Sequence, residues 1–228
     1  ELAITQLGKT CHERCAIYYQ TGDCIMPRRG LFARVRQGGL VASGDGVEVI
    51  EAVPPQRFQA VVLTISDRGS RGETADTAGP AVGSLLKDSL GAHLYTSEII
   101  PDERDEIRAR LEHFCDGHSI DLVLAVGGTG FAPRDVTPEA VAALIQRPAH
   151  GLDEAMRRAS MEKTPLAMLS RGVSGIRNST LIVSLPGSER AAVENLRAIL
   201  PALAHGLAKL RGDPEDCGPD RPAPVIGM

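Results

Sequence analysis

The sequence lacks any apolar run close to the roughly 18 residues that a membrane-spanning helix needs. Its first residues also lack the basic region and the apolar region of a secretory signal. The composition, with 43% hydrophobic and 24% charged residues in a chain of 228, is ordinary for a soluble globular protein. We therefore expect a soluble chain that is long enough for one full core and a second, smaller unit.

An excess of positive charge is absent as well, since the formal net charge is −4. A chain of this charge has no overall attraction for nucleic acid or acidic membranes, although local basic pockets are compatible with it. Its five cysteines are an odd count, which favours reduced thiols in a cytoplasm over a disulfide scaffold. We expect a cytoplasmic protein that binds neither nucleic acid nor membranes.

The N-terminal cysteines lack the spacing of a structural zinc site. Cys11 and Cys15 flank His12, and with Cys24 they offer at most three soft ligands. A structural zinc site takes four, and the second half of a zinc motif does not follow. The sequence favours buried or incidental thiols here, and it leaves a metal or redox role as the alternative.

Residues 1–53 differ in pattern from the rest of the chain. Short alternating apolar runs at 31–35 and 47–49 are separated by glycine turns, and no helical period is visible. This pattern predicts an all-β segment, either a small subdomain docked on its neighbour or a fragment of a larger β-domain. Consecutive prolines predict a linker at 54–57, and the composition of residues 213–228 predicts a flexible tail.

From residue 58 onward, apolar runs alternate with segments of helical periodicity. Continuous apolar runs predict strands of the kind buried in a parallel sheet, at 60–65, 94–100, 122–126 and 180–185. Apolar residues at helical spacing, and one more polar segment, predict helices at 82–90, 107–114, 141–145, 153–161 and 193–210. This order predicts an α/β fold with a doubly wound, mostly parallel sheet and helices on both faces.

A glycine loop, residues 127–130, follows the predicted strand at 122–126. Three glycines in four positions leave backbone N–H groups free to approach an anion, which predicts a phosphate or pterin site. The loop is not a P-loop, because the pattern Gly-x-x-x-x-Gly-Lys-Ser/Thr occurs nowhere in the sequence. It is not a dinucleotide fingerprint either, because Pro133 stands where that fingerprint has glycine. A simple tight connection is the alternative. Thr137 and Pro138 are predicted as the N-cap and first residue of the next helix.

Polar clusters follow the other predicted strands as well, at residues 66–68, 101–103 and 185–188. Because the carboxyl ends of parallel strands meet at one edge, we expect these clusters to join the glycine loop there. Sheets of this kind bind ligands at that edge. A random scatter of polar residues would not place all of the clusters there, which favours a functional site over a purely structural origin.

Single residues in these loops allow two interpretations each. Asp102 and Asp135 either cap helices or hold Mg²⁺, which binds through one or two carboxylates together with substrate phosphates. Arg68 is either a solvated charge or a phosphate clamp. Hydrogen bonding to a polar ligand suits three further loop residues, although such residues often have no such role: Ser170, Arg171 and Ser188.

Several unrelated motifs recur together between residues 58 and 212. They are Thr64-Ile65-Ser66-Asp67-Arg68, Gly72, Asp76, Gly79-Pro80, Ile100-Pro101-Asp102-Glu103, Gly127-Gly128-Thr129-Gly130, Arg134-Asp135-Val136-Thr137-Pro138, Thr164-Pro165, Leu169-Ser170-Arg171 and Leu185-Pro186-Gly187. In this order they closely resemble the molybdopterin adenylyltransferases of the MogA/MoaB type, which implies a molybdopterin-binding fold. Residues 7–50 are similar to the C-terminal part of a MOSC domain. The preceding part of such a domain is missing, so complete MOSC sulfur chemistry is not expected.

The resemblance implies transfer of AMP from ATP to the terminal phosphate of molybdopterin with Mg²⁺, releasing pyrophosphate. By motif match, Asp102 and Asp135 are the essential carboxylates and hold Mg²⁺. The same match implies substrate- and nucleotide-binding roles for Ser66, Asp67, Arg68, Gly127, Gly128, Thr129, Gly130, Thr137, Pro138, Ser170, Arg171, Pro186, Gly187 and Ser188. It also implies a homotrimer and a molybdenum insertase as a partner.

Two other functions are compatible with the sequence. A molybdopterin carrier without catalysis would share the fold and would be marked by loss of the acidic pair, but Asp102 and Asp135 are both present. A thiol or metal module would rest on the N-terminal cysteines alone.

Overall fold

The computed structural model describes residues 2–7, 31–35, 38–40, 42–46 and 58–212. The chain divides into two compact units, Glu1–Ala52 and Val53–Met228. The predicted linker and tail lie outside the described residues, and so does the N-terminal group of cysteines with His12.

In the first unit, β1 (Leu2–Leu7) pairs antiparallel with β2 (Leu31–Val35). The register shifts between Ile4 and Gln6, where the ladder is irregular. The strand predicted at 31–35 is therefore confirmed. The strand predicted at 47–49 and most of the segment that resembles a MOSC domain lie outside the described residues.

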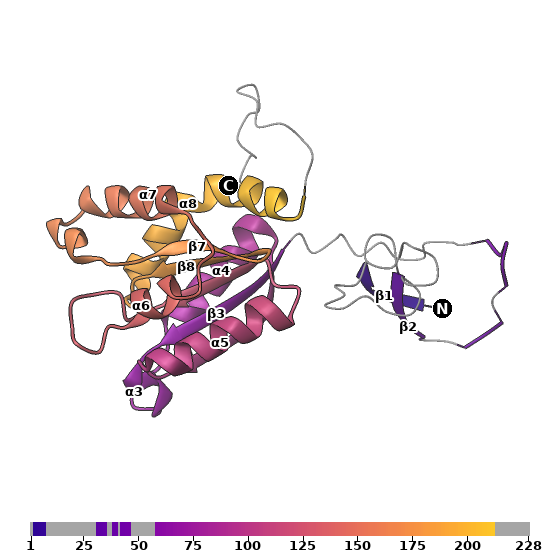
Figure 1. The fold of residues 1–228 in the computed structure, drawn as a ribbon, viewed down its shortest axis with the longest axis horizontal. Helices are drawn as coiled ribbons and strands as arrows, with labels where there is room; N and C mark the ends of the chain where they lie inside the picture. Colours follow the sequence, from indigo (N-terminus) through magenta and orange to yellow (C-terminus); the bar gives the residue numbers. More distant parts are fainter. Residues whose placement is uncertain (1, 8–30, 36–37, 41, 47–57, 213–228) are drawn as a thin grey trace, which may run out of the picture. The chain divides into compact units, whose positions relative to one another are not determined.

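The second unit contains a six-stranded sheet with the order β4-β3-β5-β8-β7-β6 (Figure 1). Its strands are β3 (Gln59–Ile65), β4 (His93–Ile100), β5 (Leu122–Val126), β6 (Arg147–Pro148), β7 (Ser174–Arg177) and β8 (Thr180–Leu185). The four predicted strands are confirmed and run parallel. β6 and β7 were not predicted, and they add an antiparallel edge beside β8.

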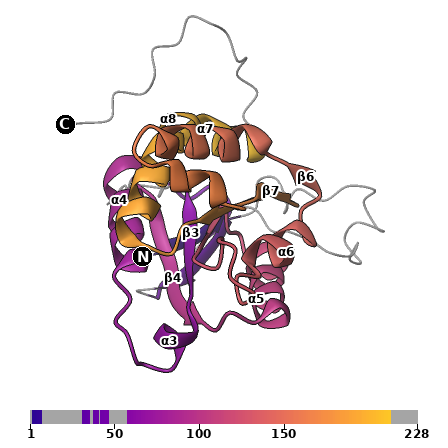
Figure 2. The ribbon, with the colours of Figure 1, turned by 90° about the vertical axis from the view of Figure 1, so that its left-hand side faces the viewer.

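Helices cover both faces of this sheet, as predicted. They are α3 (Asp67–Ser70), α4 (Ala78–Leu90), α5 (Arg104–Gly117), α6 (Thr137–Ala142), α7 (His150–Met161) and α8 (Glu189–Leu210), with a 3-10 helix η1 (Pro165–Leu169). α4, α7 and α8 pack on one face, whereas α5 and α6 pack on the other. Figures 1 and 2 show α7 and α8 side by side, with α5 across the sheet from them. Among the helices that the structure describes, none combines the length and apolarity needed to cross a bilayer.

The central strands are buried on both faces because their apolar runs are continuous. In β3, Val62 packs in the core beneath α4 and α8, while its neighbours Val61 and Leu63 face α5. Val62, Val61 and Leu63 are fully buried, and burying such a side chain contributes about 1.5–3 kcal/mol. Successive side chains of this strand therefore pack alternately into the two apolar cores, one on each face of the sheet.

The sheet has its topological switch point between β3 and β5. The chain leaves β3 toward α4 on one face, and it leaves β5 toward α6 on the other. Loops that diverge in this way open a crevice beyond the carboxyl ends of the strands, where open α/β sheets bind ligands. The glycine loop at 127–130 meets the end of β3 at this edge.

An ion pair joins three elements at the opposite, amino end of the strands. Asp121 accepts hydrogen bonds from Arg211 Nε and Nη2, each 2.6 Å long, and from the backbone N–H of Gln59, also 2.6 Å. The Arg211 guanidinium also lies 5.0 Å from the centroid of the Phe58 ring. The end of α8 is therefore tied to the starts of β3 and β5.

Candidate active site at the carboxyl edge of the sheet

The glycine loop has a backbone that only glycine adopts readily. Gly127 and Gly128 have φ angles of 116° and 61°. A Cβ on Gly127 would lie 2.3 Å from the backbone oxygen of Ile65, which no side-chain movement could relieve. A Cβ on Gly128 would lie 2.4 Å from Thr137 Oγ1 and 3.0 Å from Asp102 Oδ1. The loop therefore lies directly against the end of β3, with Thr137 and Asp102 facing it.

Thr137 does not cap α6, contrary to the prediction. The N-cap is Val136, and Thr137 and Pro138 are the first two residues of the helix. The Thr137 side chain is fully buried beside Gly128, and its backbone N–H donates to the Gly128 oxygen at 3.2 Å. Its hydroxyl has no hydrogen-bond partner among the described residues. Thr137 therefore packs against the glycine loop instead of capping the helix. A buried hydroxyl without a hydrogen-bond partner is rare in proteins.

Asp102 and Asp67 hold each other by reciprocal hydrogen bonds. The Asp67 N–H donates to Asp102 Oδ2 at 2.8 Å, and the Asp102 N–H donates to Asp67 Oδ1 at 3.1 Å. The N-cap of α5 is Glu103, so the alternative in which Asp102 caps that helix is wrong. Burial raises the pKa of the Asp102 carboxyl, and the charges of Asp67 and Asp135 raise it further. Asp102 therefore carries a negative charge that its surroundings disfavour.

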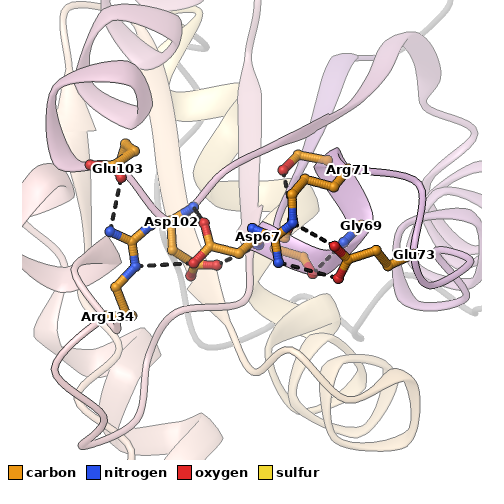
Figure 3. A network of polar contacts seen from close by, with 9 residues as sticks. Asp67, Gly69, Arg71, Glu73, Asp102, Glu103 and Arg134 are labelled. Atoms are coloured by element: carbon orange, nitrogen blue, oxygen red, sulfur yellow. Dashed lines mark hydrogen bonds and ion pairs between the residues drawn. The ribbon is translucent and has the colours of Figure 1, made fainter.

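Arg134 connects this pair to the neighbouring loops (Figure 3). Its Nε donates to Asp67 Oδ2 at 3.0 Å, and its Nη2 donates to Asp67 Oδ1 at 2.8 Å. Its Nη1 donates to Glu103 Oε1 at 2.8 Å. The hydrogen bonds from Arg134 lower the pKa of Asp67, which therefore stays ionised.

Asp135 closes its own loop instead of capping α6. Its Oδ2 accepts a hydrogen bond from the Ala132 N–H at 2.9 Å. Arg171 secures the same loop by donating to the Gly130 oxygen at 2.8 Å and to the Asp135 backbone oxygen at 2.5 Å. The Arg171 guanidinium also pairs with Glu139. Arg171 thus positions both the glycine loop and Asp135, and its predicted contact with a ligand stays a prediction.

Two of the predicted serines are helix caps. Ser66 Oγ accepts from the Gly69 N–H at 3.1 Å at the start of α3, and Ser188 Oγ accepts from the Ala191 N–H at 3.4 Å at the start of α8. Accepting a hydrogen bond leaves each O–H proton available for donation. Their predicted contacts with a ligand are therefore compatible with capping.

The predicted site residues differ in how closely they contact one another at this edge of the sheet. Direct contacts join Asp67, Asp102 and the glycine loop, and Gly187 lies so near Gly127 that a Cβ on it would be 3.3 Å from the Gly127 Cα. The Arg171 N–H donates to the Thr129 oxygen at 2.9 Å, which brings the segment after η1, including Ser170, to the loop. Pro186 follows β8 beside Gly187.

Arg68 is exposed on α3. Its guanidinium forms no hydrogen bond or ion pair with the side chains that the structure describes. Its predicted role as a phosphate clamp stays a prediction.

Four residues that support the edge were not among the predicted site residues. Asp76 accepts from Thr64 Oγ1 at 2.6 Å and from the Gly79 N–H at 2.9 Å, which anchors the loop between β3 and α4. Glu103, Arg134 and Glu139 provide the ion pairs described above. The position of Asp76 three residues before Gly79 was a usable local signal for a turn. The ion pairs had no such local signal, because the two residues of each pair lie about 30 positions apart in the sequence.

The carboxylates at this edge fit a hard divalent cation. Asp102 and Asp135 provide oxygen donors, and the charge of Asp135 disfavours that of Asp102. The described residues contain no group of three or more metal-binding side chains. Mg²⁺ needs fewer, because it usually binds one or two carboxylates and completes its shell with water and substrate oxygens.

Residues 61–205 match the family model described as a probable molybdopterin binding domain. The chain belongs to this family. That assignment covers most of the second unit, including every loop of the candidate site. It also agrees with the resemblance drawn from the sequence motifs.

Individual family members are similar over the same part of the chain. The molybdopterin adenylyltransferase of Helicobacter pylori J99 is 41% identical over 159 residues, covering 69% of this chain and 90% of that protein. The gephyrin of Dictyostelium discoideum is 39% identical over 168 residues, covering 70% of this chain but only 23% of that protein. The crystal structure of the molybdopterin biosynthesis enzyme MoaB from Thermus thermophilus is 45% identical, with a TM-score of 0.65, covering 70% of this chain and 99% of that one.

Proposed function

We propose that this protein transfers AMP from ATP to the terminal phosphate of molybdopterin in molybdenum cofactor biosynthesis. The observation that carries this proposal is the placement of Asp102 and Asp135. Both carboxylates lie at the switch point beside the glycine loop, and neither caps a helix. A similar protein from Helicobacter pylori is named for this activity, which supports the same activity here.

In this reaction an oxygen of the molybdopterin phosphate attacks the α-phosphorus of ATP. A new phosphorus–oxygen bond forms, the bond between the α-phosphorus and the bridging oxygen breaks, and pyrophosphate leaves with the electron pair. Such transfers need little covalent chemistry from the protein, which mainly positions the reactants and stabilises charge. The chain therefore needs a rigid anion site and a means of offsetting negative charge.

The glycine loop provides the anion site. The φ angles of Gly127 and Gly128 and their close contacts fix the direction of the backbone in this turn. Free N–H groups in such a turn bind phosphate oxygens without rearranging. In this loop they belong to residues 128–130, because the Gly127 N–H donates to the Leu185 oxygen at 3.0 Å, so the predicted contact between the Gly127 N–H and a ligand is wrong. The exposed guanidinium of Arg68 and the hydroxyls of Ser66 and Ser188 add donors on the neighbouring loops.

Asp102 and Asp135 would hold the Mg²⁺ ion. When bound, this ion supplies positive charge that offsets the charge of the ATP phosphates. Asp102 is suited to the role because burial disfavours its negative charge, so a nearby cation relieves an existing cost. Arg134 and Arg171 hold the loops that carry the two acids.

We propose further that the chain assembles as a homotrimer in the cytoplasm and passes its product to a molybdenum insertase. Exposed apolar side chains on and beside η1 support self-association: Met161, Leu166, Met168 and Leu169. A similar protein of Synechococcus elongatus is named as a bifunctional protein of molybdenum cofactor biosynthesis, which supports coupling to a further step.

A product assay tests the proposed activity. The purified chain is mixed with molybdopterin, ATP and Mg²⁺, and the pterin is analysed by chromatography and mass spectrometry. We expect adenylylated molybdopterin and an equal amount of pyrophosphate. If molybdopterin binds but is recovered unchanged, the protein is a carrier and the proposal is wrong.

A further inference from the structure

The Arg134 side chain links the loops that carry the two acids. Its guanidinium binds both oxygens of Asp67, at 2.8 and 3.0 Å, and one oxygen of Glu103, at 2.8 Å. Asp67 follows β3, Glu103 begins α5, and Arg134 lies on the loop after β5 (Figure 3). One side chain therefore fastens three strand-to-helix connections together.

These contacts matter for geometry more than for stability. The side chains of Arg134 and Glu103 are 54% and 57% exposed, and exposed ion pairs contribute little to folding. A planar guanidinium that meets both oxygens of a carboxylate nevertheless fixes the orientation of that carboxylate. Arg134 has this arrangement with Asp67.

Asp67 links this guanidinium to Asp102 by two hydrogen bonds, one through its carboxylate and one through its backbone N–H. Asp67 Oδ1 accepts from Arg134 and also from the Asp102 N–H, while the Asp67 N–H donates to Asp102 Oδ2. With Oδ2 held in this way, Asp102 Oδ1 lies on the side of Gly128, 3.0 Å from the position of a Cβ there. One oxygen of Asp102 is thus used for positioning and the other is directed at the glycine loop.

Asp135 is the next residue after Arg134, so the same contacts also fix the second acid. The Asp135 carboxylate is bonded within its own loop, to the Ala132 N–H. A loop that is closed internally moves as a unit, and Arg134 is its connection to the Asp67 side of the edge. The spacing between Asp102 and Asp135 therefore depends on this arginine, together with Arg171, which binds the Asp135 backbone oxygen.

We propose that Arg134 is a positioning residue of the adenylyl-transfer site, acting through Asp67 to set the direction of the Asp102 carboxylate and its spacing from Asp135. This inference rests on the proposed function. It assigns Arg134 no contact with substrate.

The test compares Arg134→Gln with a matched variant, Arg211→Gln, which removes another bidentate arginine–aspartate pair at the far end of the sheet. For Arg134→Gln we expect kcat to fall about 10- to 100-fold with little change in the KM for ATP, as for other misplaced catalytic groups. Amide hydrogen exchange at Asp67 and Asp102 should accelerate, while Tm changes little. Arg211→Gln should lower Tm and leave kcat and both amides unchanged.

A second variant, Arg134→Lys, separates geometry from charge. Lysine keeps the positive charge but cannot bind both carboxylate oxygens in the planar arrangement of arginine, so we expect it to restore little of the lost kcat. Full activity in Arg134→Lys, or wild-type kcat and amide exchange in Arg134→Gln, would overturn the proposal. If the wild-type chain makes no product, the proposed function fails. The exchange rates of the Asp67 and Asp102 amides would then still decide whether Arg134 positions them.

Discussion

The two ends of the sheet each hold an arginine bound to both oxygens of an aspartate, but they differ in what surrounds the pair. At the amino end, Arg211 and the Gln59 N–H satisfy Asp121, whose side chain is 11% exposed. At the carboxyl end, Arg134 holds Asp67, and Asp67 in turn holds Asp102. Burial and two neighbouring acids raise the pKa of Asp102. The Arg211–Asp121 pair thus ties secondary-structure elements together at the amino end. At the carboxyl end, the Arg134–Asp67 pair holds Asp102, whose negative charge is disfavoured.

This difference shows which end of the sheet is suited to bind a ligand. The contacts at the amino end tie elements of secondary structure together, because Asp121 and Arg211 join the starts of β3 and β5 to the end of α8. At the carboxyl end the contacts join loops, and the backbone there has positive φ angles at Gly127 and Gly128. Loops held on a rigid sheet are where such folds bind and transform ligands.

Removing the charge of either acid should have the largest effect. In Asp102→Asn and Asp135→Asn, size and most hydrogen bonding are kept while a metal-binding charge is lost. AMP transfer should fall by roughly two orders of magnitude or more in either variant. Molybdopterin binding should change far less, because backbone N–H groups carry much of the anion contact.

Single-turnover kinetics beside equilibrium pterin binding measure this prediction. Normal transfer in both variants would show that the acids take no part in catalysis. An equal collapse of binding and transfer would assign them a structural role instead. Either result would remove the proposed contrast between the two ends of the sheet.

Adding a methyl group to the glycine loop should damage the fold itself. In Gly127→Ala the new Cβ would lie 2.3 Å from the Ile65 backbone oxygen, in a residue with φ of 116°. We expect a loss of about 2 kcal/mol or more in the free energy of unfolding. Gly151→Ala in α7 is the control, because its Cβ would meet no atom within 4 Å. Equal stability of the two variants in urea would contradict this account of the loop.

Breaking the pair at the amino end should lower stability without touching catalysis. Arg211→Gln leaves Asp121 without this cationic partner, but Arg211 is 45% exposed, so solvent compensates in part. We expect a loss of about 1–2 kcal/mol in the free energy of unfolding. Transfer by the folded protein should stay within about twofold of wild type, since this end lies away from the reaction. A large loss of AMP transfer in a fully folded Arg211→Gln variant would refute the assignment of stability to this end of the sheet and of catalysis to the other.

The smallest expected effect concerns the charge of Asp102 in folding. Because burial raises its pKa, the folded protein binds a proton more tightly than the unfolded chain does. Between the unfolded and folded pKa values, stability therefore falls as pH rises, and the ionised carboxylate costs stability at neutral pH. Asp102→Asn should melt at a higher temperature than wild type at about pH 7, and the gain should shrink at about pH 3.5. A lower Tm for the variant at neutral pH would contradict the raised pKa.

The sequence predicted the parts of the fold that local patterns encode. The apolar runs at 122–126 and 180–185 have the bounds of β5 and β8, because polar or glycine residues punctuate them. β6 and β7 were missed because they have only two and four residues and lack a continuous apolar run. Such short edge strands form through pairing with a neighbour, which a local pattern does not show.

For the site, the sequence predicted which loops meet but not how their side chains pair. The order of strands and helices placed Asp102 and the glycine loop at one edge, as observed. The bond from Arg134 to Asp67 joins residues 67 positions apart, and no spacing rule reaches so far. Thr137 was misread as a cap because its burial beside Gly128 depends on tertiary packing.

The most direct test of the central claim follows a labelled phosphorus through a single turnover. The chain, in excess over molybdopterin, is mixed with Mg²⁺ and ATP labelled at the α-phosphorus. The label should appear on the pterin in one equivalent per molybdopterin, with unlabelled pyrophosphate released. Label that stays entirely in ATP, while molybdopterin is shown to be bound, would contradict catalysis at the carboxyl edge of this sheet.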